Sequence, residues 1–107
     1  MYIIFNNMEF ELPANIGFTI YSKSGCLNCN KIKKVLKEKK FLFKEIICDE
    51  YIIEDKETFL NFIKNLTQEE CKFFPIIFFD GKFVGGYDET LVYIEKIMLT
   101  FEDNLVF

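Results

Sequence analysis

Two cysteines separated by two residues, Cys26 and Cys29, constrain the fold of this chain more than any other feature. They stand where an apolar run, 16–21, gives way to a lysine-rich amphipathic run, 28–40. This order predicts that Cys26 lies at a strand-to-helix junction, near the unpaired N–H groups and the positive dipole end of a helix. Such surroundings lower a thiol pKa from about 8.5 to about 3.5–7.5. Cys29, one turn further on, can then attack a mixed disulfide formed at Cys26.

The same spacing also occurs in stable disulfides and as half of a metal site. A zinc module would need Cys48 and Cys71 as well, but the chain has a single C-x-x-C pair and no His. Cys48 ends an apolar strand and is expected in the core, whereas Cys71 is expected near the surface as an inert thiol. The strand–helix context therefore favours redox chemistry, with no metal expected.

Length and composition predict one domain, 1–107, because half of the residues are apolar and such a chain buries a core without disulfide staples. The net charge is −4 and there is no Arg, which argues against nucleic acid as a partner. The start of the chain lacks the basic region and apolar run of a signal peptide, and no run is long enough to span a membrane. These features predict a cytoplasmic protein with no membrane partner.

The hydrophobic pattern predicts an α/β fold. Two short β-prone runs around Asn6 and Asn7 predict a hairpin, an accessory ribbon within 1–13 that pads the sheet edge. The strands expected for the main sheet are 16–21, 41–48, 75–79 and 82–84. The helices expected are 28–40, 55–66 and 88–100, followed by an apolar tail, 101–107. The first strand, helix and second strand suit a right-handed parallel βαβ unit.

With this order of elements, residues 16–98 resemble a glutaredoxin of the dithiol type. The resemblance rests on three motifs: Tyr21-Ser22-Lys23-Ser24-Gly25-Cys26, Phe73-Phe74-Pro75 and Gly85-Gly86-Tyr87-Asp88-Glu89. It implies a thioredoxin-like fold, in which a mixed four-stranded central sheet is flanked by about three helices. The ribbon is then a short N-terminal β extension to this fold.

The resemblance also implies that glutathione is the co-substrate. The residues that it assigns to glutathione are Lys23, Lys72, Phe74, Pro75, Gly86, Tyr87 and Asp88. A cis Pro75 would turn the backbone of Phe74 toward Cys26, where an extended peptide can pair with it. The helix that starts near Asp88 would bind the γ-glutamyl carboxylate, with Glu89 as the alternative to Asp88 for the ammonium group. Lys23, and less regularly Lys72, would pair with the glycyl carboxylate.

We therefore expect a monomeric, glutathione-dependent thiol–disulfide oxidoreductase, with Cys26 as nucleophile and Cys29 as resolving thiol. Its expected substrates are proteins with disulfides and glutathionylated proteins. Leu27 and Asn28 stand where the family commonly has Pro-Tyr, and this change leaves two alternatives open. One is an iron–sulfur cluster carrier that uses glutathione as a ligand, and the other is a thioredoxin-like reductant that is independent of glutathione.

Overall fold

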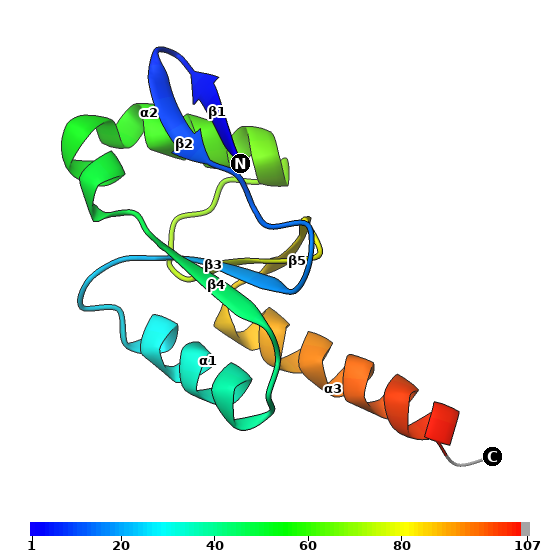
Figure 1. Ribbon diagram of the computed structural model, residues 1–107. Coiled ribbons are helices and arrows are strands. Elements are labelled where there is room, and N and C mark those ends of the chain that lie inside the picture. Colours follow the sequence, from blue (N-terminus) through cyan, green and yellow to red (C-terminus); the bar gives the residue numbers. More distant parts are fainter. Residues whose placement is uncertain (106–107) are drawn as a thin grey trace.

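The computed structural model describes residues 1–105 (Figure 1). In chain order the elements are β1 (Tyr2–Phe5), β2 (Met8–Glu11), β3 (Phe18–Ser22), α1 (Leu27–Glu38), β4 (Phe43–Ile47), α2 (Asp49–Thr67), β5 (Ile76–Phe79), β6 (Lys82–Gly85) and α3 (Tyr87–Leu105). The main sheet has the strand order β4-β3-β5-β6, with β3 parallel to β4 and the other neighbours antiparallel. This mixed four-stranded sheet with its three helices confirms the thioredoxin-like α/β fold. No helix in the described part of the chain is long and apolar enough to cross a membrane.

The sheet separates two layers (Figure 1). Helices α1 and α3 cover one face, and α2 with the β1–β2 ribbon lies on the other. Successive side chains of β3 point to opposite faces of the sheet, so this strand contributes to both cores. Phe18 and Ile20 pack under α1 and α3, while Tyr21 packs with α2. Every residue of β3 is buried, as expected for a central strand covered on both faces.

The ribbon does not pad the edge of the main sheet, so that expectation was wrong. Strands β1 and β2 pair only with each other and pack over α2. Phe10 is fully buried and stacks on Phe62 with ring centroids 4.4 Å apart. The backbone N–H of Glu11 donates to the Tyr51 hydroxyl at 3.1 Å, and the Tyr21 hydroxyl donates to the Glu11 carbonyl at 2.7 Å. The ribbon is thus part of the α2-side core.

Two helices are longer than the sequence pattern predicts. Helix α2 starts at Asp49 and is interrupted at Asp55, where φ is −162° and ψ is 91°. The Asp55 carboxylate accepts from the backbone N–H and the hydroxyl of Thr58, at 3.1 and 2.8 Å, so it caps the second segment of α2. The predicted helix 55–66 is this second segment. Helix α3 continues through 101–105, which were expected as a tail, and 106–107 lie outside the described residues.

Candidate active site

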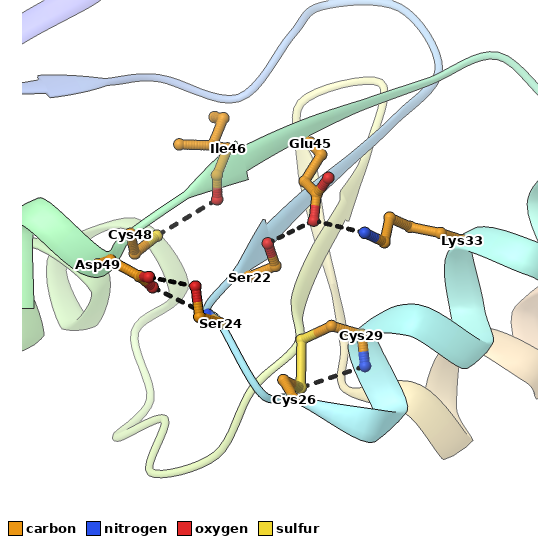
Figure 2. Close-up of a disulfide and its surroundings, with 9 residues drawn as sticks. All are labelled: Ser22, Ser24, Cys26, Cys29, Lys33, Glu45, Ile46, Cys48 and Asp49. Atoms are coloured by element: carbon orange, nitrogen blue, oxygen red, sulfur yellow. Dashed lines mark hydrogen bonds and ion pairs between the residues drawn. A yellow bond between two sulfur atoms is a disulfide. The ribbon is translucent and has the colours of Figure 1, made fainter.

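The two cysteines of the C-x-x-C pair form a disulfide at the start of α1 (Figure 2). Cys26 is the N-cap residue, with extended backbone, and its sulfur accepts from the backbone N–H of Cys29 at 3.1 Å. The predicted strand-to-helix junction is therefore present. A sulfur at this position faces the unpaired N–H groups of the first turn, which favour its thiolate form.

The two sulfurs differ in access. Cys29 is 1 % exposed, because it lies on the same buried face of α1 as Ile32 and Leu36. Cys26 is half-buried and open to solvent. An incoming disulfide can therefore reach Cys26 but not Cys29.

The loop before β5 lies at the same edge of the sheet as the cysteines. The Phe74–Pro75 peptide bond is cis, as predicted. The pairing of Tyr21 with Ile76 places Pro75 beside the end of β3 that leads into the cysteine motif. The ammonium group of Lys23 lies 5.6 Å from the centre of the Phe74 ring, so these two residues lie together beside the cysteine motif.

The start of α3 reaches the same edge. A Cβ built on Gly86 would lie 3.6 Å from the Pro75 carbonyl oxygen, which places this glycine next to the cis-proline loop. Tyr87 lies under the ammonium group of Lys31, which is 5.5 Å from the ring centre and belongs to α1. Asp88 is exposed at the first turn of α3.

One backbone donor at this helix start is already in use. The Gly86 N–H donates to a Glu89 carboxylate oxygen at 2.9 Å, the reciprocal half of a capping box. Glu89 therefore acts as a local cap at the start of α3. The donors that remain for a bound carboxylate lie further along the first turn.

A polar pair that the sequence analysis did not single out supports the loop before Cys26. The Asp49 carboxylate accepts from the Ser24 backbone N–H at 2.9 Å and from the Ser24 hydroxyl (Figure 2). Hydrogen bonds from the Ser24 hydroxyl and backbone N–H hold the pKa of the Asp49 carboxyl below its ordinary value. Ser22 pairs with Ile47 in the parallel register, so Ser24 and Asp49, each two residues further along, lie close together. The predicted βαβ unit therefore already indicated that these two segments would be neighbours.

A second polar group links β3, β4 and α1 behind the motif. The Ser22 hydroxyl donates to a Glu45 oxygen at 2.7 Å, and Lys33 pairs with the same oxygen at 2.9 Å (Figure 2). Burial alone would raise the pKa of Glu45, but the hydrogen bonds from Ser22 and Lys33 and the charge of Lys33 lower it overall. This group fixes α1 on the sheet one turn beyond Cys29.

Comparison with known proteins agrees with this geometry. The family model described as Glutaredoxin matches residues 18–84, which is more than half of the chain. The chain belongs to the glutaredoxin family. Its paired Cys26 and Cys29 fit the dithiol type of that family, and thiol–disulfide oxidoreductase activity follows from family and fold.

Solved glutaredoxin structures show the same fold. Glutaredoxin 1 from Francisella tularensis, complexed with cacodylate, is 26 % identical with a TM-score of 0.65, over 76 % of this chain and 94 % of that one. A wheat glutaredoxin is 27 % identical with a TM-score of 0.62, over 77 % of this chain and 74 % of that one. A buckwheat glutaredoxin–glutathione complex is 22 % identical with a TM-score of 0.62, over 78 % of this chain and 72 % of that one. No curated protein sequence matches the chain.

Two hollows flank the cis-proline loop of this glutaredoxin, and both include Lys72. The larger, of about 700 Å³, lies on the α2 side and contains Lys23 and Phe74. The smaller, of about 350 Å³, contains Pro75 and Gly86. Lys72 itself is exposed. The residues that the resemblance assigned to glutathione thus lie around one loop at one edge of the sheet, with the exposed Asp88 beside Tyr87 at the start of α3.

The other two cysteines of the glutaredoxin chain are poor nucleophiles. Cys48 is fully buried. Burial and the nearby Asp49 charge raise its pKa to about 12, although a hydrogen bond with the Ser22 backbone acts in the opposite direction. Burial also raises the pKa of the half-buried Cys71, and the Glu69 charge adds to this effect. A hydrogen bond with the Thr67 side chain lowers the pKa by less than burial raises it. Among the side chains that the structure describes, no group of three or more Cys, Asp or Glu is arranged to hold a metal ion.

Proposed function

We propose that the chain is a glutathione-dependent oxidoreductase that reduces protein disulfides and protein–glutathione mixed disulfides. The observation that supports this most is the pairing of an accessible Cys26 at a helix N-cap with a buried Cys29 one turn away. The accessible sulfur is suited to attack a substrate. The buried Cys29 sulfur is suited to react only with Cys26, because a substrate in solution cannot contact a side chain that is 1 % exposed.

In the dithiol route, the Cys26 thiolate attacks one sulfur of a protein disulfide, breaks the S–S bond and releases the other sulfur as a thiolate. Cys29, as its thiolate, then attacks the Cys26 sulfur, which closes the Cys26–Cys29 disulfide and releases the second substrate thiolate. Two glutathione thiols reopen this disulfide in turn. The balance is one protein disulfide reduced and one glutathione disulfide formed.

In the monothiol route, Cys26 takes the glutathionyl group from a glutathionylated protein and releases that protein as a thiol. A second glutathione thiolate attacks the glutathionyl sulfur, which frees Cys26 and yields glutathione disulfide. We propose that Lys23 and Lys72 pair with the glycyl carboxylate and that the Phe74 backbone, held by Pro75, pairs with the peptide. Gly86, Tyr87 and Asp88 would then hold the γ-glutamyl end.

The test separates the two sulfurs. Cys26→Ser is expected to abolish reduction of both a protein disulfide and a small glutathionyl disulfide, in an assay that couples glutathione disulfide formation to a reductase. Cys29→Ser is expected to spare the second reaction and abolish the first. Full activity of Cys26→Ser would refute the proposal, and wild-type turnover without glutathione would contradict the assigned co-substrate.

A further inference from the structure

The two edges of the β1–β2 ribbon differ. On the β2 edge, the backbone N–H of Glu11 donates to the Tyr51 hydroxyl at 3.1 Å, and its carbonyl accepts from the Tyr21 hydroxyl at 2.7 Å. Lys44 also forms an ion pair with the Glu11 carboxylate. The outward backbone groups of Glu11 are therefore occupied, so no further strand can pair with β2 there. The edge that remains for pairing is that of β1.

The register of the hairpin determines which backbone groups of β1 face outward. The Leu12 N–H donates to the Met1 carbonyl at 2.8 Å, so these two residues form a pair of the hydrogen-bonded kind. Bonded and non-bonded pairs alternate along an antiparallel ladder, so Ile3 also bonds to β2, whereas Tyr2 and Ile4 direct their N–H and C=O groups away from it. No residue that the structure describes forms a hydrogen bond with these outward groups.

The β1 edge also lacks the features that usually protect an exposed strand. Natural edge strands carry charged side chains, Pro or a β-bulge, which prevent pairing with another chain. Residues 1–7 contain no charged residue and no Pro, and β1 pairs with β2 without a bulge. Instead, the edge exposes apolar side chains: Tyr2 is 58 %, Ile3 43 % and Ile4 72 % exposed. Such an edge suits a second uncharged, apolar strand.

The β1 strand is complementary to itself. If two copies pair antiparallel about a two-fold axis at Ile3, Tyr2 of each copy lies opposite Ile4 of the other. The outward N–H and C=O groups of both residues then form hydrogen bonds across the axis. Ile3 faces its own equivalent, and Tyr2 packs against Ile4, an aromatic–β-branched pair of the kind that stabilises sheets. Glu9 and Glu11 lie on β2, one strand further from the axis, so no like charges face each other.

A hollow beside β1 provides room for the second strand. It has a volume of about 390 Å³ and lies between the turn end of the ribbon and the C-terminal end of α2. Its one charged residue, Lys64, pairs with Glu70. In the self-paired register, Met1 of the second copy lies opposite Phe5 at this hollow, on the face that packs on α2. Met1 is 83 % exposed, and a flexible Met side chain fills irregular gaps well.

We propose that β1 pairs with β1 of a second copy of this chain, which forms a symmetric dimer with a continuous sheet in the order β2-β1-β1-β2. The inference does not rest on the proposed function, and it replaces the monomer that the sequence led us to expect. The ribbon packs over α2, whereas Cys26 precedes α1 on the other face of the main sheet (Figure 1), so each copy keeps an accessible cysteine motif. Because one short strand from each copy forms the interface, the dimer is weak and dissociates on dilution.

Cysteine cross-linking tests the register. At a non-hydrogen-bonded pair the Cα atoms are about 4.5 Å apart, which is within the range that a disulfide spans. Ile3→Cys is therefore expected to form an intermolecular disulfide under mild oxidation about tenfold faster than Ile4→Cys. Ile4→Cys is the matched control, because Ile4 is more exposed than Ile3 but lies opposite Tyr2 rather than its own equivalent.

Both cysteine variants are made in a chain whose other accessible thiols are removed by Cys26→Ser, Cys29→Ser and Cys71→Ser. Cys48 is retained because it is fully buried. Electrophoresis without reductant, at timed intervals, measures the rate of cross-linking. A rate for Ile4→Cys equal to or above that of Ile3→Cys would indicate random collision and would overturn the proposed pairing.

Sedimentation velocity tests the dimer in the unmodified chain. The average mass of wild type is expected to rise towards twice the monomer mass as the concentration increases. Ile4→Lys places a charge on the open edge of both copies and should weaken dimerisation about tenfold. Ile16→Lys is the matched control, since it makes the same exchange at a side chain that is also 72 % exposed, and it should leave the dimer intact.

Turnover of a small glutathionyl disulfide separates this inference from the proposed function. Ile4→Lys and Ile16→Lys are both expected to keep kcat/KM within about twofold of wild type, because neither residue belongs to the proposed site. A dimer that is lost only in Ile4→Lys supports the inference even if the chain proves not to use glutathione. A monomeric wild type at every concentration, or equal weakening of the dimer in both variants, would overturn it.

Discussion

At the scale of single residues, the position of Cys26 on α1 determines its chemistry. An N-cap sulfur accepts a backbone N–H bond and faces the helix dipole, and both effects favour the thiolate. Cys29 belongs to the same turn of the chain but lies on the buried face of α1. The division of roles between the two cysteines therefore follows from the helix geometry.

Alkylation tests this contrast among all four cysteines. In the reduced protein at neutral pH, we expect iodoacetamide to modify Cys26 first, Cys71 more slowly and Cys48 only on unfolding, because burial raises the pKa of both Cys71 and Cys48. Peptide mass spectrometry at timed intervals gives the order. The oxidised protein is the control, in which Cys26 is protected by its disulfide. Rapid labelling of Cys48 in the folded protein would contradict the buried position.

The Glu45 carboxylate gives a prediction on pH. Its pKa is lower in the folded chain than in the unfolded chain, so its stabilising effect is complete above the unfolded pKa, about 4.5, and is lost as the pH falls through the folded pKa. Glu45→Gln should lower the free energy of unfolding by about 1 kcal/mol at pH 7 and by less at pH 3. Urea unfolding across this pH range measures the difference, and a constant difference would count against the assignment.

At the scale of elements, the β1–β2 ribbon and α2 form one unit. Phe10 lies between rings from α2, with centroid distances of 4.4 Å to Phe62, 4.9 Å to Tyr51 and 6.1 Å to Phe59. The backbone of β2 is further held by tyrosine hydroxyls from α2 and β3. The same helix supplies Phe59 as the support for Phe74, so the ribbon stabilises the helix that forms one wall of the site.

Phe10→Ala tests this coupling. Removal of a fully buried ring is expected to lower the free energy of unfolding by about 3–5 kcal/mol. Ile4→Ala, on the neighbouring strand, is the control, because Ile4 is 72 % exposed and its loss should cost less than about 0.5 kcal/mol. Guanidinium unfolding measures both values. A small effect of Phe10→Ala would show that the ribbon is dispensable for the core.

At the scale of the whole molecule, the central strand β3 joins two cores. Its side chains alternate between the α1–α3 layer and the α2 layer. If one layer is lost, the strand on which the other layer packs loses the contacts of half its side chains. The active site lies where these layers meet, with Cys26 at the start of α1, Lys23 after β3 and Pro75 before β5. Loss of either core should therefore disassemble the site.

We accordingly expect a single unfolding transition in which far-ultraviolet and near-ultraviolet circular dichroism change together. Ile32→Val on the α1 side and Phe62→Leu on the α2 side should each lower the free energy of unfolding by about 1 kcal/mol or somewhat more. Because the two side chains belong to different cores, the double variant should show the sum within about 0.5 kcal/mol. Two separate transitions would indicate that the layers unfold independently.

The sequence by itself determined the order of elements and the redox pair, because these depend on local signals. The cis form of Pro75 followed only from the resemblance to the glutaredoxin family. The apolar periods of β3 and α1 and the C-x-x-C spacing each lie within a few residues. The three motifs that resemble a glutaredoxin are equally local, so the linear order of residues was enough to predict the family. The kink at Asp55 and the full length of α3 were missed, since helix ends depend on packing as well as on pattern.

Only the tertiary structure decided how distant segments meet. The ribbon has the same sequence pattern whether it pairs with the main sheet or packs over α2, and the aromatic contacts of Phe10 settle this choice. The Ser24–Asp49 pair and the hollow between α2 and the cis-proline loop likewise join residues that are distant in the sequence. Such contacts depend on the register of strands and the tilt of helices, which a linear pattern of apolar and polar residues does not specify.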